Sequence, residues 1–139
     1  MLVSKTQVLN LITQITDRIF IGDCNYTKED LAEHEINYVI NLCGQCTGYE
    51  DRWIHLADDN TNPDFLVNGA VNELANRLCV GYKVLVHCRE GRSRSPFIIA
   101  LWLERCGFGW LEANRFVKAR YDKVRIEPLL FLSHDTQIS

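Results

Sequence analysis

Hydrophobic and polar positions along the chain fall into two alternating patterns. Short runs rich in β-branched residues predict buried strands, because the strands of a parallel sheet are covered on both faces. The segments between these runs repeat apolar residues at a helical spacing, which predicts helices packed through one face. The predicted strands are Arg18–Gly22, Asn37–Leu42, Trp53–Ala57 and Lys83–His87. The predicted helices are Lys28–Glu35, Asp64–Val80, Pro96–Arg105, Trp110–Tyr121 and Leu129–His134.

Local signals mark the ends of several of these elements. Thr27 is the expected N-cap of the first helix, and Asp30 places a carboxylate in its first turn, where the helix dipole favours it. Pro96 suits the first turn of its own helix. The segment Asp58–Pro63 is dense in turn formers and predicts a loop. Leu2–Ile15 is loosely helical in pattern and predicts an N-terminal appendage.

The alternation of strands and helices predicts an α/β fold around a mostly parallel sheet. The chain has 139 residues, the usual length of one domain, so we expect residues 1–139 to form a single domain. Ligands of such sheets bind where the strands end at their carboxyl side. Cys88 directly follows the most strand-like segment, so this is where we expect the chemistry.

Composition and charge narrow the class of protein. The formal net charge is −3, whereas general nucleic-acid and membrane-surface binders are more often basic. The N-terminus has no basic start followed by an apolar run, and no apolar stretch is long enough to span a bilayer. Six cysteines lie mostly inside apolar runs, which favours a reduced, cytoplasmic protein over a disulfide scaffold. We expect a monomer.

One loop between a predicted strand and a predicted helix is unusually basic. Its sequence is His87-Cys88-Arg89-Glu90-Gly91-Arg92-Ser93-Arg94-Ser95-Pro96. Gly91 gives the loop freedom to curl, so that successive backbone N–H groups converge at the helix N-terminus into a nest for a tetrahedral anion. The same field favours a nucleophilic thiolate at Cys88. The planar guanidinium of Arg94 suits two oxygens of one phosphate.

This loop resembles the signature of the protein tyrosine phosphatase superfamily, His-Cys-five residues-Arg-Ser/Thr, and in particular its dual-specificity branch. Arg18–Asn41 is similar to the opening strand, helix and strand of that branch, and Ile126-Glu127-Pro128 to its closing element. The resemblance therefore covers roughly Arg18 to Leu132. It implies a four- to five-stranded, mostly parallel sheet flanked by helices. It also implies a phosphomonoester hydrolase that acts through a phosphocysteine.

The resemblance assigns a role to each part of the site. Cys88 attacks phosphorus, Arg94 and the loop residues hold the phosphoryl oxygens, and Ser95 assists departure of the sulfur. Asp58 follows the strand Trp53–Ala57 where the family has its proton donor, and it protonates the leaving group. The residues expected to line the substrate are Arg89, Glu90, Gly91, Arg92 and Ser93.

Several alternatives stay open at these positions. Asp59 is adjacent to Asp58 and competes for the role of acid, although a turn or cap role suits it better. His87 is expected to hold the loop by hydrogen bonds rather than to act as a base. Arg89 and Arg92 are as well explained as solvated loop residues.

Cys43 has two interpretations. It follows the Asn41-Leu42 pair, as does a cysteine of lipid-phosphatase relatives that forms a reversible disulfide with the nucleophile, and by that resemblance it protects oxidised Cys88. Simple burial explains it equally well. The lone Cys43-Gly44-Gln45-Cys46 pair has no partner pair, so we expect no zinc there. We expect no other metal and no cofactor either, because the backbone dipoles of the loop and Arg94 supply the positive charge.

The substrate is less well defined than the chemistry. The chain has no insertion resembling a deep phosphotyrosine-recognition loop, which favours a phosphoprotein substrate with phosphotyrosine, phosphoserine or phosphothreonine. Arg89 and Arg92 match positions that meet additional phosphates in phosphoinositide phosphatases, so a phosphoinositide, inositol phosphate or RNA 5′-triphosphate is the alternative.

Two rival classes of protein fit the sequence less well. A non-catalytic phospho-binding module would usually lose the cysteine, the arginine or the acid, and this chain keeps all three. Arsenate reductases have the loop near the N-terminus and the acid downstream, the reverse of the order here.

The chain departs from the dual-specificity pattern at one place. The family often carries an asparagine after the proline that precedes the last helix, and this asparagine braces the loop. This chain has Pro128-Leu129-Leu130 there, so that brace is missing or is supplied by other groups.

Overall fold

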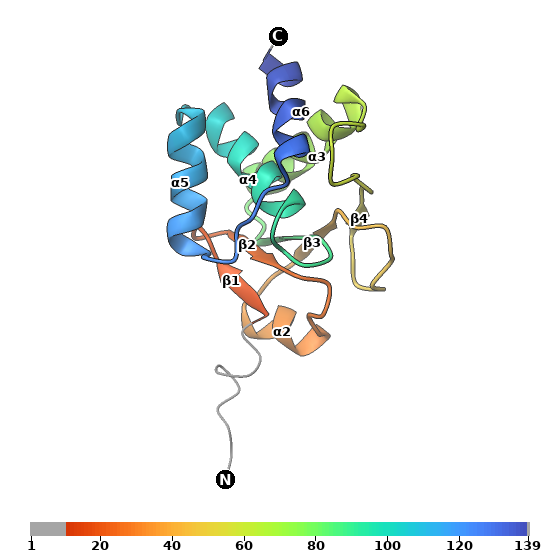
Figure 1. Ribbon diagram of the computed structural model, residues 1–139. Helices are drawn as coiled ribbons and strands as arrows, with labels where there is room; N and C mark the ends of the chain where they lie inside the picture. Colours follow the sequence, from red (N-terminus) through yellow and green to blue (C-terminus); the bar gives the residue numbers. More distant parts are fainter. Residues whose placement is uncertain (1–10, 139) are drawn as a thin grey trace.

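A computed structural model describes the chain from residue 11 to residue 138 (Figure 1). A five-stranded sheet lies at its centre, with strand order β1-β2-β5-β3-β4. The strands are β1 (Ile12–Gln14), β2 (Ile19–Gly22), β3 (Tyr38–Asn41), β4 (Arg52–Trp53) and β5 (Val84–His87). Only the edge strand β1 is antiparallel to its neighbour, and the other three pairings are parallel. The mostly parallel α/β sheet predicted from the sequence is therefore confirmed.

Helices cover the two faces of the sheet unequally. One face carries the short helix α2 (Lys28–Glu33), and the opposite face carries the four remaining helices (Figure 1). These are α3 (Asp64–Cys79), α4 (Arg94–Arg105), α5 (Trp110–Arg120) and α6 (Pro128–Ile138). Between residues 11 and 138 we find no helix with the length and apolar character needed to cross a membrane.

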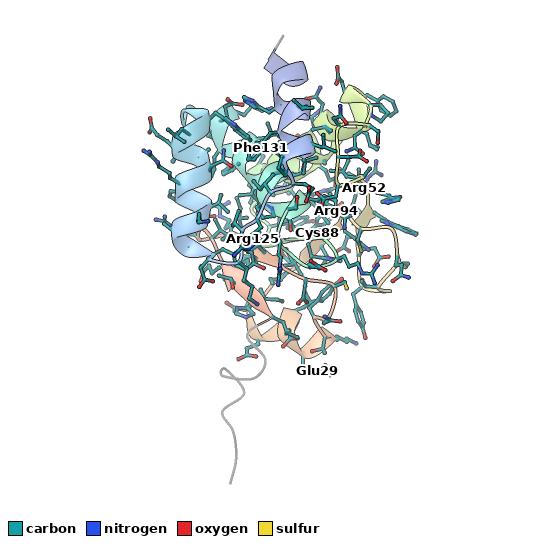
Figure 2. The ribbon with its side chains drawn as sticks, in the orientation of Figure 1. Glu29, Arg52, Cys88, Arg94, Arg125 and Phe131 are labelled. Atoms are coloured by element: carbon teal, nitrogen blue, oxygen red, sulfur yellow. The ribbon has the colours of Figure 1, made fainter. Side chains whose placement is uncertain are left out.

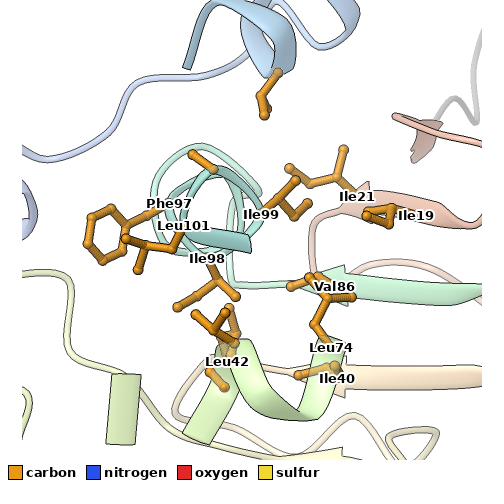
Figure 3. Close-up of a cluster of buried hydrophobic side chains, with 14 of the residues drawn as sticks. Ile19, Ile21, Ile40, Leu42, Leu74, Val86, Phe97, Ile98, Ile99 and Leu101 are labelled. Atoms are coloured by element: carbon orange, nitrogen blue, oxygen red, sulfur yellow. The ribbon is translucent and has the colours of Figure 1, made fainter. Parts of the chain in front are cut away.

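The central strand β5 contributes to both cores because its side chains alternate between the faces. Val84 and Val86 pack into the larger core beneath the four helices, whereas Leu85 packs into the smaller core against α2. In the larger core, α4 is buried along most of its length and inserts Ile98 and Ile99 against the strands (Figure 3). This packing fixes the N-terminus of α4 directly beyond the end of β5.

Most predicted elements form, with ends shifted by one or two residues, and α6 extends four residues beyond its predicted end at His134. The N-cap predicted at Thr27 is confirmed: its hydroxyl accepts from the Asp30 N–H at 3.2 Å, and the Asp30 carboxylate accepts from the Thr27 N–H at 2.8 Å. This reciprocal pair satisfies two N–H groups that the start of a helix otherwise leaves without partners. Helix α4 begins at Arg94, before the predicted start at Pro96.

Two predictions of secondary structure are wrong in part of their range. The helical pattern assigned to Leu2–Ile15 ends in strand β1, because residues 12–14 pair with β2, and residues 1–10 lie outside the described part of the chain. The strand predicted at Trp53–Ala57 stops at Trp53. Beyond it the Ile54 and Leu56 N–H groups still bond to Asn41 and Leu42, so the chain stays extended beside β3 without a continuous ladder.

Candidate active site

Cys88 lies at the carboxyl edge of the sheet, one residue after β5. Because β2, β3 and β5 are parallel, their ends at Gly22, Asn41 and His87 lie side by side at this edge. The Cys88 side chain is only 2% exposed and lies at the wall of a cavity of about 360 Å³. Its Sγ is 3.1 Å from the Ser95 hydroxyl oxygen, a contact that stabilises negative charge on sulfur when the hydroxyl donates.

The loop after Cys88 turns tightly at Gly91, which has a φ of +72°. A Cβ at this position would lie 2.6 Å from the Tyr121 hydroxyl and 2.9 Å from the Gly22 carbonyl oxygen. Glycine is therefore required here both by backbone conformation and by space. The loop is also tied to the β2 side of the sheet, because the Cys24 N–H donates to the Arg89 carbonyl at 3.2 Å.

Tyr121 supports this turn from the end of α5. It is buried, and burial together with the nearby Cys88 and Asp23 raises its pKa, so the phenol is neutral at physiological pH. No pattern in the sequence points to Tyr121 as a site residue. Its role follows only from the folded position of α5 against the loop.

Arg94 is the first residue of α4 and connects the loop to a second segment. Its Nη1 donates to the Leu56 carbonyl at 2.9 Å, and Leu56 is two residues before Asp58. The guanidinium is half-buried and lines the same cavity as Cys88 (Figure 2). The helix dipole of α4 and a permanent positive charge therefore act on the same small space.

Asp58 is brought to the cavity and Asp59 is not among the residues that line it. The Ser93 hydroxyl donates to Asp58 Oδ1 at 2.5 Å. Asp59 instead closes a local turn: its carboxylate accepts from the Thr61 hydroxyl at 2.5 Å and from the Thr61 N–H at 2.8 Å, and these two hydrogen bonds lower the pKa of Asp59. The placement thus separates two neighbouring carboxylates into one that faces the cavity and one that shapes the loop.

The segment before α6 braces the Cys88 loop in place of the asparagine that the family often carries. The Arg125 N–H donates to the Arg92 carbonyl at 2.7 Å. The Glu127 N–H donates to the Ser93 hydroxyl oxygen at 2.9 Å. Backbone groups of residues 125–127 therefore hold the loop, which explains how the fold manages with Leu129 after the proline.

Charged side chains of both signs line the cavity. It is lined by Asp58, Cys88, Arg89, Glu90, Arg92, Ser93, Arg94, Arg125 and Glu127. No motif in the sequence identifies Arg125 or Glu127 as a site residue, although Glu127 lies in the Ile126-Glu127-Pro128 segment that resembles the closing element of the family and Arg125 directly precedes it. Figure 2 shows Arg125 on the same side of the molecule as Cys88 and Arg94. Four arginines face three carboxylates, so the cavity is only weakly positive before a thiolate forms.

His87 is fully buried on the opposite side of β5, where its ring meets Tyr26 edge-on at 4.7 Å between centroids. Burial lowers the pKa of His87 to about 4, so the imidazole is neutral at pH 7. Its Nδ1 lies 3.4 Å from the Cys88 carbonyl oxygen. This position suits support of the backbone at Cys88 rather than proton transfer in the cavity.

Cys43 lies near the same edge, just beyond β3. Its thiol donates to Asn41 Oδ1 at 2.9 Å, and its N–H donates to the same oxygen at 2.8 Å. The Leu42 N–H pairs with the His87 carbonyl, which places Cys43 beside the start of the Cys88 loop. All six cysteines are free thiols, and the redox role of Cys43 stays a prediction.

The comparison with known families defines the class of protein. The model of the dual specificity phosphatase catalytic domain matches residues 19–131, which is most of the chain and includes every site residue described above. The chain therefore belongs to the dual-specificity phosphatases of the protein tyrosine phosphatase superfamily, and the protein is a phosphatase. A search of curated proteins found no match.

Solved structures with the same fold cover nearly the whole chain. A single-residue variant of human DUSP28 has a TM-score of 0.80 and 19% sequence identity, covering 91% of this chain and 92% of that chain. A mouse putative dual specificity phosphatase complexed with zinc tungstate has a TM-score of 0.80 and 18% identity, covering 91% and 86%. The human tyrosine phosphatase-like serine/threonine/tyrosine-interacting protein has a TM-score of 0.73 and 20% identity, covering 91% and 95%.

Proposed function

We propose that this phosphatase hydrolyses phosphomonoesters on protein side chains through a phosphocysteine formed on Cys88. The observation that carries the proposal is the meeting of three groups in one cavity. Cys88 supplies a nucleophile, Arg94 a fixed guanidinium, and Asp58 a carboxyl group within reach of a bound ester. Each has a distinct step to perform, and no other cluster of the described residues combines them.

In the first step the Cys88 thiolate attacks phosphorus while the ester P–O bond breaks. The electron pair of that bond leaves on the substrate oxygen, which takes the proton of Asp58. Arg94 and the backbone N–H groups at the start of α4 stabilise the negative charge on the phosphoryl oxygens. The hydrogen bond from Arg94 Nη1 to the Leu56 carbonyl holds this guanidinium in a fixed position relative to the segment that carries Asp58.

In the second step water attacks phosphorus and gives a proton to Asp58. The S–P bond breaks, and its electron pair returns to sulfur as a thiolate. The Ser95 hydroxyl, 3.1 Å from that sulfur, donates a hydrogen bond to it and makes it a better leaving group. Inorganic phosphate is released, and the charge states of Cys88 and Asp58 are those of the starting enzyme.

The charge of the cavity favours a phosphoprotein substrate. Glu90 and Glu127 lie among the arginines of its wall, and they offset the attraction for further phosphates. A phosphotyrosine, phosphoserine or phosphothreonine side chain brings one phosphate and leaves the outer charges to contact the surrounding protein surface. The free thiols fit a reducing intracellular location for such substrates.

A polyphosphorylated substrate is a second candidate because Arg92 and Arg125 both line the cavity. Both side chains are exposed, and the Arg125 N–H donates a hydrogen bond to the Arg92 carbonyl. Two guanidinium groups in this position suit a second phosphate of an inositol phosphate, a phosphoinositide or an RNA 5′-triphosphate.

A substrate panel tests both candidates. We expect the wild type to hydrolyse an aryl phosphate and phosphopeptides, and the Cys88→Ser and Asp58→Ala variants to lose activity by about 100-fold or more. Equal rates for the three proteins would overturn the proposed chemistry. Arg92→Ala distinguishes the substrates: a loss confined to polyphosphorylated compounds would favour the second candidate over the first.

A further inference from the structure

An open groove that the phosphatase chemistry does not use lies beside the active-site cavity. It has a volume of about 490 Å³ between α5, α6 and the segment that joins them. Its apolar wall includes Trp110 and Leu111 of α5, Ile126 of the connecting segment and Phe131 of α6. Leu111 is 62% exposed, and an apolar side chain in such a setting often marks a contact surface.

The groove and the active-site cavity share Arg125 as a lining residue. The same residue lines both spaces, together with Cys88 and Arg94 in the cavity and with Phe131 in the groove; Figure 2 labels these four residues. The two spaces are therefore neighbours on the surface, separated by a single exposed side chain. The remaining polar residues of the groove are Asn114 and the cationic Lys118.

Backbone hydrogen bonds fix the groove relative to the nucleophile. The Arg125 N–H bonds to the Arg92 carbonyl, and the Glu127 N–H bonds to the Ser93 hydroxyl. The wall of the groove is thus joined to the loop that carries Cys88. Two subsites held at a fixed distance favour ligands whose two binding groups have the matching separation. The protein loses little conformational entropy on binding such a ligand, because the subsites are already in place.

We infer that the groove is a specificity subsite for an apolar side chain of the phosphoprotein substrate, an inference that rests on the proposed function. The phosphorylated residue occupies the cavity at Cys88, and an aliphatic or aromatic side chain close to it in sequence occupies the groove. Since an extended chain advances roughly 3.3 Å per residue and the two spaces share one residue as their wall, this side chain lies within about three residues of the phosphorylated one.

Charge supports a peptide as the occupant. Lys118 and Arg125 flank the apolar wall, so they suit an acidic residue or backbone carbonyls next to the apolar side chain. The groove is also short and open, as a single side chain requires. We therefore expect substrates in which an apolar and an acidic residue lie near the phosphorylated residue.

A set of phosphotyrosine peptides tests the inference. In each peptide one leucine replaces a serine at a single position up to about three residues before or after the phosphotyrosine, and kcat/KM is measured for the intact chain. We expect leucine at one or two of these positions to raise kcat/KM about tenfold. Leu111→Glu should abolish the preference and leave kcat/KM for para-nitrophenyl phosphate unchanged, because that substrate does not reach the groove.

Val80→Glu is the matched control. Val80 is 64% exposed and lies at the end of α3, outside both spaces. It should keep the full leucine preference. Equal kcat/KM for all peptides, or a preference that survives in Leu111→Glu, would overturn the subsite while the proposed phosphoprotein activity stands. Hydrolysis of para-nitrophenyl phosphate without hydrolysis of any peptide would instead overturn the phosphoprotein substrate.

A lipid occupant gives a different result in the same variants. Phosphoinositide in phosphatidylcholine vesicles would then be hydrolysed faster than its water-soluble headgroup, and Leu111→Glu would remove that advantage. This outcome would contradict the inference, because the groove would hold an acyl chain instead of a peptide side chain.

Discussion

Ser93 lies where three segments of the active site meet. Its hydroxyl donates to Asp58 of the acid loop and accepts from the Glu127 N–H before α6. It also occupies the N-cap position of α4, yet its side chain makes no capping bond there. The hydroxyl therefore positions the proposed proton donor. Because it does not cap the helix, the N–H groups at the start of α4 stay available to the phosphoryl group of the proposed substrate.

Replacing Ser93 by alanine should misplace Asp58 without removing it. We expect kcat/KM, which reports the first step, to fall about tenfold for aryl phosphates with poor leaving groups and to change little for those with good ones, because only the former need a proton in that step. Ser93→Thr should restore the rate. Steady-state kinetics across leaving groups give the answer, and an equal loss for all of them would show that Ser93 has no special relation to the acid.

The double variant with Asp58→Ala isolates the interaction. If Ser93 acts through Asp58, adding Ser93→Ala to Asp58→Ala has no further effect on kcat. Additive losses would contradict this positioning role.

At the scale of elements, continuous apolar runs made β2, β3 and β5 predictable, since buried parallel strands leave a strong pattern. Strand β1 has three residues and pairs at the sheet edge, so its pattern could not be separated from a weak helix. The positions of Cys88 and Arg94 were predictable because one local motif contains both, and that of Asp58 because the resembling family has its acid after the corresponding strand. Arg125 and Tyr121 were not, since they join the site only through the packing of distant segments.

Two glycines give a matched test of the loop. Gly91→Ala should destabilise the protein by about 2–4 kcal/mol and abolish activity, because the new methyl group meets Tyr121 and the Gly22 carbonyl at a positive φ. Gly69→Ala, inside α3 with open space around it, should stabilise by about 0.5–1 kcal/mol. Urea unfolding of the two variants measures both changes, and equal shifts would contradict the packing described at Gly91.

At the scale of the whole molecule, one buried ionisable side chain affects stability. His87, the last residue of β5, is buried on the face of the sheet that carries the smaller core. His87 points toward the α2 side of the sheet with Tyr26 and is fully buried. Within the described residues its Nε2 is one of two buried side-chain atoms without a hydrogen-bond partner. Burial of the imidazole in its charged form, without a partner for Nε2, would destabilise the folded state, so the fold favours the neutral form.

Stability should therefore decline in mild acid. The pKa of His87 is about 4 in the folded protein against 6.5 ordinarily, so the unfolded chain binds the extra proton first as pH falls. The free energy of unfolding should decrease between pH 6.5 and 4, by about 3 kcal/mol in total. His87→Gln should flatten this dependence. Urea unfolding at a series of pH values tests it, and an unchanged slope in the variant would exclude His87 as the cause.

The covalent intermediate on Cys88 is the central claim, and rapid acid quench of a single turnover tests it most directly. The Asp58→Ala variant, which slows hydrolysis of the intermediate, is mixed with an aryl phosphate, quenched and analysed by mass spectrometry. We expect one phosphoryl group on the peptide that contains Cys88, and none in the Cys88→Ser variant treated alike. Release of the phenol without any phosphorylated protein, or a phosphoryl group on a different residue, would contradict the mechanism.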